Sequence, residues 1–279
     1  SNIGDDLIQY LDPELYAVPY DYSPIAFIYD SERINITELK FEDFYDPEMA
    51  NKLVTEDPTT STTGVAFLMW QIGIYEKLLK KDWKEWWSKV KGKIDVQPSW
   101  GAAYFDVFMN EEAGRPIVVS YLTSPVYHYL YENTTRFKPM LVKYDGSWYA
   151  WYQIQAIGIV KNSPMKDLAY KFIDWLLSDE IQSMVYYCDI MLPAHKEEIN
   201  KIPEDVLATM VFNLTEIKAV NSLLSVNEIA QNIDKWLEDW KNLMTAPPAF
   251  GAVYLIITVV VIVAILVAIY VRFYRRKLQ

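Results

Sequence analysis

Hydroxyl residues crowd one short stretch of this chain of 279 residues. Residues 57–64 read DPTTSTTG and directly precede the apolar run 65–79, whose spacing is typical of a helix. One hydroxyl would be enough to cap that helix, whereas this stretch supplies five. The N-terminus of a helix also offers free N–H groups and a positive potential to an anion. The residues by themselves leave two interpretations equally open, a simple helix cap and a cradle for a phosphate or another polar ligand.

Aromatic and hydroxyl side chains also meet in two later stretches. Trp100 lies in a loop after Pro98 and Ser99, and residues 121–127 end an apolar, strand-like run and begin a predicted helix. In open α/β sheets, ligands bind beyond the carboxyl ends of the strands, so a ligand site is expected in such loops. Any single aromatic residue here could belong to the core instead. Together, these residues could stack on a flat or cationic ring.

The sequence contains none of the common catalytic motifs, neither G-x-S-x-G, H-E-x-x-H, a P-loop nor G-x-G-x-x-G. His128 and His195 are the only histidines, and their spacing does not suit a zinc pair, so each is interpreted as a surface or packed residue. Cys188 is the single cysteine and is expected to be a small buried side chain. We therefore predict a protein that is not an enzyme and has neither a metal site nor a cofactor.

The charge of the chain excludes one class of partner. The formal net charge is −11, and four of the basic residues follow the last apolar run, so the rest of the chain is more acidic still. A nucleic-acid phosphate backbone requires a basic footprint. Nucleic acid is therefore not an expected partner.

Residues 249–271 form an uncharged apolar run that is long enough to cross a membrane as a helix. A buried core helix is the alternative, but the basic tail 272–279 is typical of a cytoplasmic flank, which would place the preceding residues outside the cell. Residues 245–248 then form a short linker. We expect a single-pass membrane anchor, and, since Ser1 is neither a methionine nor part of a signal segment, a start downstream of the true N-terminus.

The remaining patterns predict an alternation of strands and helices. Strands are expected over 18–29, 116–121, 140–144 and 148–160, and the Asp145-Gly146 pair between the last two is a strong hairpin signal. Helices are expected over 65–79, 81–91, 102–109, 165–177 and 223–244, and from Ser124-Pro125 onward. The fourth of these would be capped by Ser163, and the second should bury Trp83, Trp86, Trp87 and Val90 on one side. This alternation predicts an α/β architecture.

Three segments resemble, in order and in spacing, motifs of the solute-binding proteins of thiamine ABC transporters. Residues 57–64 resemble the D-P-x-T-S-T-x-G loop of that family, residues 100–104 its W-x-x-A-Y segment, and residues 120–128 its S-Y-x-T-S-P-x-Y-H segment. Residues 18–22 are similar to the family's crossing between two lobes. The resemblance covers roughly residues 15–244.

The resemblance implies an α/β fold of two lobes, of the type II periplasmic-binding kind, with a ligand clamped between them. Residues 1–23 would be a remnant of lobe 1 and the crossing strand, residues 24–150 lobe 2, and residues 151–244 the C-terminal part of lobe 1. The N-terminal part of lobe 1 would then be missing. The family also has a tryptophan near the segment 189–193, where this chain has Ile190.

The resemblance also implies a ligand and the residues that contact it. Ser61 and Thr62 would bind the hydroxyl or phosphate end of thiamine or a thiamine phosphate, and Trp100 and Tyr127 would stack on its rings. The remaining residues that would line the site are Tyr121, Leu122, Thr123 and Ser124.

The expected partners are the permease and ATPase subunits of an ABC transporter. A carrier of ferric iron, a polyamine or an anion is an alternative, although iron carriers of this fold commonly present adjacent tyrosines and this chain has Tyr121-Leu122 at that place. A membrane-tethered enzyme whose catalytic residues lie upstream of this sequence is the remaining alternative.

Overall fold

The computed structural model describes residues 3–12, 14 and 16–246. Within these ranges, no helix is both long enough and apolar enough to cross a membrane. The predicted membrane helix, its basic tail and the second half of the short linker, residues 247–248, lie outside the described residues.

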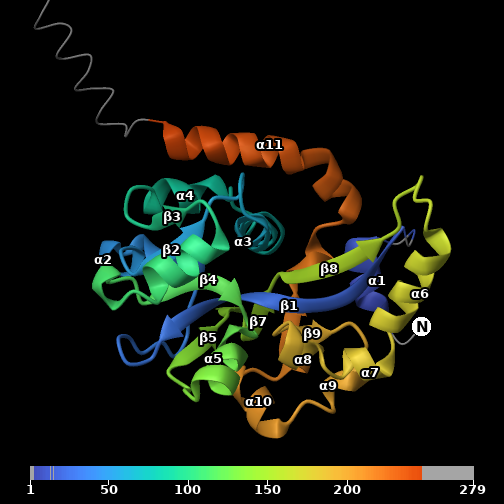
Figure 1. Cartoon of the computed structure of the whole chain (residues 1–279). Coiled ribbons are helices and arrows are strands. Elements are labelled where there is room, and N and C mark those ends of the chain that lie inside the picture. The colour runs from blue at the N-terminus through green and yellow to red at the C-terminus, as the bar shows by residue number, and fades with distance from the viewer. Residues whose placement is uncertain (1–2, 13, 15, 247–279) are drawn as a thin grey trace, which may run out of the picture.

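A single long strand, β1 (Ala17–Asp30), runs through the centre of the molecule (Figure 1). Its first half pairs with β8 (Tyr152–Gly158) and β9 (Leu192–Pro193), and its second half pairs with β4 (Ile117–Tyr121) and β5 (Phe137–Met140), all antiparallel. The predicted strand over 18–29 is therefore confirmed. Because both groups of strands share β1, it links the two halves of the sheet.

The second half of the sheet has the order β3-β2-β4-β1-β5. β2 (Leu53–Glu56) is parallel both to β3 (Asp95–Gln97) and to β4. Helix α3 (Thr62–Ile72) continues into a π-helical segment, Gly73–Leu79, and α4 (Lys84–Val90) follows. The predicted apolar face of the second helix is confirmed, because all four of its residues are buried in a core dense in aromatic rings: Trp83, Trp86, Trp87 and Val90.

The hairpin signal is confirmed. β6 (Val142–Tyr144) and β7 (Ser147–Ala150) are antiparallel, and Tyr144 pairs with Ser147 across a two-residue turn. Asp145 and Gly146 both have positive φ, at 49° and 74°, as a type I′ turn requires. β10 (Ile217–Ala219) adds to β7 in parallel.

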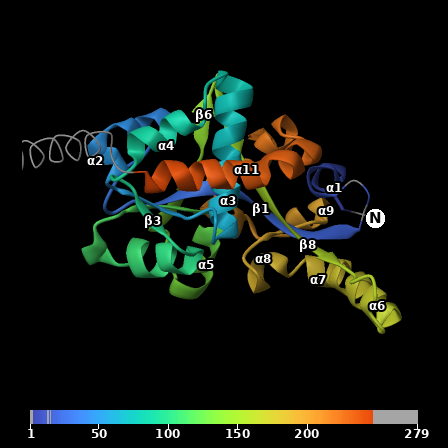
Figure 2. The same ribbon diagram turned by 90° about the horizontal axis from the view of Figure 1, so that it is seen from above.

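The other helices surround this framework. They are α1 (Asp5–Leu11), α2 (Pro47–Ala50), α5 (Ser124–Glu132), α6 (Lys166–Leu176), α7 (Asp179–Gln182), α8 (Val185–Cys188), α9 (Lys196–Ile199), α10 (Glu204–Thr209) and α11 (Val226–Thr245). A further π-helical segment spans Ala102–Phe108. Figures 1 and 2 show α11 crossing over α3, while α6 lies at the edge of the molecule, far from α4.

Three local predictions are wrong. Ser163 is not the N-cap of α6. The N-cap is Met165, and the backbone N–H of Met165 donates a hydrogen bond to the Ser163 hydroxyl. The last helix begins at Val226 rather than at residue 223, because Ser225 caps it by accepting from the N–H of Glu228. Cys188 is exposed rather than buried, since it ends the short helix α8 at the surface.

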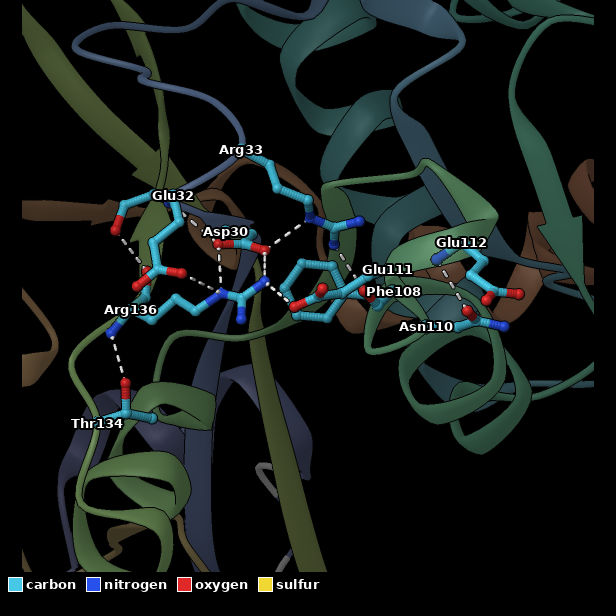
Figure 3. A network of polar contacts seen from close by, with 10 residues as sticks. Asp30, Glu32, Arg33, Phe108, Asn110, Glu111, Glu112, Thr134 and Arg136 are labelled. Atoms are coloured by element: carbon cyan, nitrogen blue, oxygen red, sulfur yellow. Dashed lines mark hydrogen bonds and ion pairs between the residues drawn. The ribbon is translucent and has the colours of Figure 1, made fainter.

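A buried ionic network holds the far end of β1 (Figure 3). The fully buried carboxylate of Asp30 accepts hydrogen bonds from Arg136 at 2.7 and 2.5 Å and from Arg33 at 2.6 Å. Burial alone would raise the pKa of Asp30, but these donors lower it below its usual value. Arg33 also donates to the Phe108 carbonyl, and Arg136 binds Glu111. The network therefore ties the strand end to the segment after residue 102.

Candidate functional site

A cavity of about 340 Å³ opens where the two halves of the sheet meet. One side is built by the loop and π-helical segment after residue 99, the end of β4 and the start of α5. The other side comes from β8 and the segment that follows α8. The lining residues are Trp100, Tyr104, Phe105, Tyr121, Thr123, Ser124, Tyr127, Gln155, Asp189, Ile190 and Met191.

The aromatic wall of the cavity is held in place by hydrogen bonds. Trp100 stacks on Tyr104 with ring centroids 5.0 Å apart, and the Trp100 indole N–H donates to the Ser120 hydroxyl at 2.8 Å. The Tyr104 hydroxyl lies 2.8 Å from Nε2 of His128, whose Nδ1 lies 2.6 Å from Glu132. His128 is fully buried and is thus a packed residue that supports the wall, as one interpretation of the sequence held.

The hydroxyl groups of the wall are engaged with one another. Thr123 donates to the Ser23 hydroxyl at 3.2 Å, and Ser124 lies 2.8 Å from the Ser120 hydroxyl. The Tyr121 hydroxyl lies 3.2 Å from that of Thr63. Burial raises the pKa of Tyr121, so its phenol stays protonated. These contacts give the wall a defined shape before any ligand arrives.

Most hydroxyls of the DPTTSTTG stretch serve the loop itself. Ser61 caps α3 by accepting from the Gly64 N–H at 3.4 Å, Thr59 bonds to Asp57, and Thr60 donates to a backbone carbonyl. Thr62 is exposed. Neither Ser61 nor Thr62 lines the cavity. The helix-cap interpretation therefore describes Ser61. The N-terminus of α3 contacts the cavity wall only indirectly, because the Thr63 hydroxyl lies against that of Tyr121.

The structure brings five of the eight predicted ligand residues together at the cavity, namely Trp100, Tyr121, Thr123, Ser124 and Tyr127. Leu122 does not join them, because its side chain is fully buried and does not line the cavity. Ligand contact by all eight residues stays a prediction.

Sequence reasoning missed much of the opposite wall. Gln155 comes from β8, where it accepts a 2.7 Å hydrogen bond from the Tyr20 hydroxyl. Asp189, Ile190 and Met191 follow α8, and Ile190 has a φ of 57°, a conformation that is rare for a β-branched residue. The departure from the family pattern at Ile190 was the signal that could have drawn attention to this segment.

Two buried carboxyl groups lie near the cavity. Asp21 of β1 is fully buried, and burial together with the nearby Asp189 carboxyl raises its pKa to about 9. Glu56 at the end of β2 is also fully buried, and burial raises its pKa well above the usual value. Burial is the largest influence on the pKa of Tyr121; its hydrogen bond with Thr63 lowers that pKa, and the nearby acids Glu56 and Asp21 raise it. Two acidic residues thus lie close to the cavity lining, and the raised pKa of Asp21 keeps its carboxyl group protonated near neutral pH.

An aromatic cavity between two halves of an α/β sheet joined by one strand is the arrangement of a protein that binds a small molecule between lobes. Residues 1–211 match the family model described as bacterial extracellular solute-binding protein, and the chain belongs to this family. It is a family of binding proteins, which agrees with the prediction that the chain is not an enzyme.

The chain is also similar in sequence to individual proteins of known description. The chain is 29% identical over 223 residues to the thiamine-binding periplasmic protein of Brucella abortus, covering 80% of this chain and 62% of the relative. It is 25% identical to the protein of the same description from Escherichia coli, covering 82% and 64%. The chain thus spans less than two thirds of the length of these relatives.

A solved periplasmic thiamin binding protein superposes with a TM-score of 0.62 at 23% identity, covering 82% of this chain and 66% of that one. This likeness shows the α/β fold of periplasmic binding proteins, so the predicted fold class is confirmed at that level.

Proposed function

We propose that this protein captures thiamine or a thiamine phosphate outside the cell and delivers it to the permease and ATPase of an ABC transporter. The observation that carries the proposal is the cavity wall in which Trp100 stands with Tyr121 and Tyr127. The names of the relatives support the same ligand.

The chemistry of the cavity suits thiamine. Its thiazolium ring is a cation, and aromatic faces attract cations, most strongly where water is excluded. Its rings are flat, so they can stack on Trp100 and Tyr127, while Tyr121, Thr123 and Ser124 offer hydroxyl groups at the same wall. Ser61 and Thr62 would meet the hydroxyl or single phosphate at the far end of the ligand, at the N-terminus of α3.

We also propose the arrangement of the chain around this site. Residues 24–150 would form one lobe and residues 151–244 part of the other, with β1 crossing between them. Residues 249–271 would anchor the protein in the membrane and leave 272–279 in the cytoplasm, which is supported by the uncharged run and its basic flank.

Calorimetry with thiamine, its monophosphate and its diphosphate tests the function directly. We expect saturable binding of at least one of them and a matching thermal stabilisation. Trp100→Ala should weaken that binding about 10-fold to 100-fold, because a stacking and cation–π contact contributes about 1–3 kcal/mol. Trp175→Ala is the matched control, since Trp175 is an exposed tryptophan of α6 that does not line the cavity. No heat and no thermal shift with any of the three ligands would refute the proposal.

Two rival functions have their own readouts. A visible charge-transfer band on addition of ferric salt would favour an iron carrier. Turnover of thiamine during incubation would favour an enzyme. We expect neither, since the cavity wall presents single tyrosines at separate positions and the described residues contain no cluster of potential metal ligands.

A further inference from the structure

The side of the cavity opposite the aromatic wall contains two carboxyl groups in contact. Asp21 of β1 lies directly opposite Gln155 of β8, and directly opposed residues of an antiparallel pair point to the same face of the sheet. Gln155 lines the cavity, and Asp21 lies beside it, behind the lining and next to a bulge of β1. Asp189 lines the cavity from the segment after α8 and lies within hydrogen-bonding reach of Asp21.

Asp21 is unusual because it is fully buried and neither of its side-chain oxygens has a donor among the described residues. A buried carboxylate without donors or a countercharge is strongly disfavoured. A bond between Asp21 and Asp189 forms only when one of the two groups holds a proton. Asp21, whose pKa is raised to about 9, therefore holds its proton near neutral pH and can share it with Asp189.

Within the described residues, no basic side chain is among the groups that influence the pKa of Asp21. β8 and β9, which pair with β1 at this point, carry no charged residue. The ionisable groups that face Asp21 are Asp189, Tyr20 and Tyr121, and Glu56 lies beyond Tyr121. Carboxyl and phenol groups are either neutral or negatively charged, so none of these groups can supply a positive charge. A bound ligand could therefore supply the positive charge that the carboxyl pair lacks.

We propose that the Asp21–Asp189 pair is the cation subsite of the cavity, in which Asp21 positions Asp189 through the shared proton before the ligand arrives and Asp189 then faces the positive ring of the ligand. The inference rests on the proposed function and specifies how the ligand is selected. When the cation enters, the proton shared by the pair leaves to solvent, and both carboxylates then face one positive charge. Binding of one cation should therefore release up to one proton.

The test compares thiamine with its isostere in which a neutral thiophene ring replaces the thiazolium. For the wild-type protein, we expect the neutral isostere to bind at least about tenfold more weakly, because only thiamine brings the positive charge. Asp189→Asn should reduce this preference severalfold while changing binding of the isostere little. Asp106→Asn is the matched control, because Asp106 is exposed beside the lining residue Phe105 but does not line the cavity.

A second readout concerns Asp21 alone. Calorimetry of thiamine binding at neutral pH in buffers of different ionisation enthalpy should show proton release in the wild-type protein and little release in Asp21→Asn. Equal affinity for thiamine and the isostere, or thiamine binding without proton release, would overturn the carboxyl-pair inference and leave the proposed function intact. Failure of the wild-type protein to bind thiamine at all would instead overturn the proposed function and this inference with it.

Discussion

At the scale of single residues, close packing at Gly64 links the DPTTSTTG loop to the sheet. A Cβ atom at this position would lie 2.8 Å from the carbonyl oxygen of Glu56 and 2.9 Å from backbone atoms of Asp57. Backbone atoms cannot move aside as a flexible side chain can. Gly64→Ala should therefore destabilise the protein by about 1–3 kcal/mol, measured by urea unfolding.

Gly101→Ala is the control for this prediction, because nothing lies within 4 Å of a Cβ atom built at Gly101. Gly101 also precedes a helical segment, where alanine is favoured over glycine. An unfolding free energy for Gly64→Ala equal to that of the wild type would contradict the close approach of α3 to the end of β2.

At the scale of elements, helix α6 stands out because none of its residues is buried. Its apolar side chains lie on one face, yet Leu168 is 57% exposed and Trp175 is 53% exposed. An exposed apolar face promotes association of the protein with itself. Replacing Leu168 and Phe172 together by Gln should therefore reduce aggregation, measured by light scattering, and change the unfolding free energy by less than about 1 kcal/mol.

The matched control replaces Phe67 of α3, which is fully buried between other aromatic rings. Phe67→Ala should cost about 3–5 kcal/mol. A similar loss for the double variant of α6 would mean that its face is packed in solution.

At the scale of the whole molecule, the buried acids make stability depend on pH. Asp21 has a pKa of about 9 in the folded protein, far above the usual 3.8. Below about pH 4 both the folded and the unfolded state hold this proton, so its contribution to stability is fully present. Between about pH 4 and pH 9 the unfolded state has lost the proton while the folded state keeps it, so stability falls by about 1 kcal/mol per pH unit.

Asp21→Asn removes the ionisable proton and keeps the shape of the side chain. We expect this variant to lose less stability than the wild type between about pH 5 and pH 8, measured by urea unfolding at each pH. Glu56 acts in the same direction because burial raises its pKa as well. Identical pH profiles for Asp21→Asn and the wild type would show that Asp21 is ionised in the folded protein.

Much of the framework could be predicted because its signals are local. The apolar strand of residues 18–29, the Asp145-Gly146 turn and the tryptophan face of α4 each depend on the period or turn chemistry of a few adjacent residues. The spacing of Trp100 and residues 121–127 likewise predicted one wall of the cavity.

The sequence by itself therefore determined the α/β character of the chain and its aromatic wall, whereas only the tertiary structure decided which polar groups complete the cavity. Asp21 meets Gln155 through the register of β1 and β8, and Asp189 reaches the same place only after α8 has been positioned. The burial that keeps Asp21 protonated arises from neighbours distant in the chain. A periodic pattern specifies which face a residue occupies, but the partner on that face is set by long-range register.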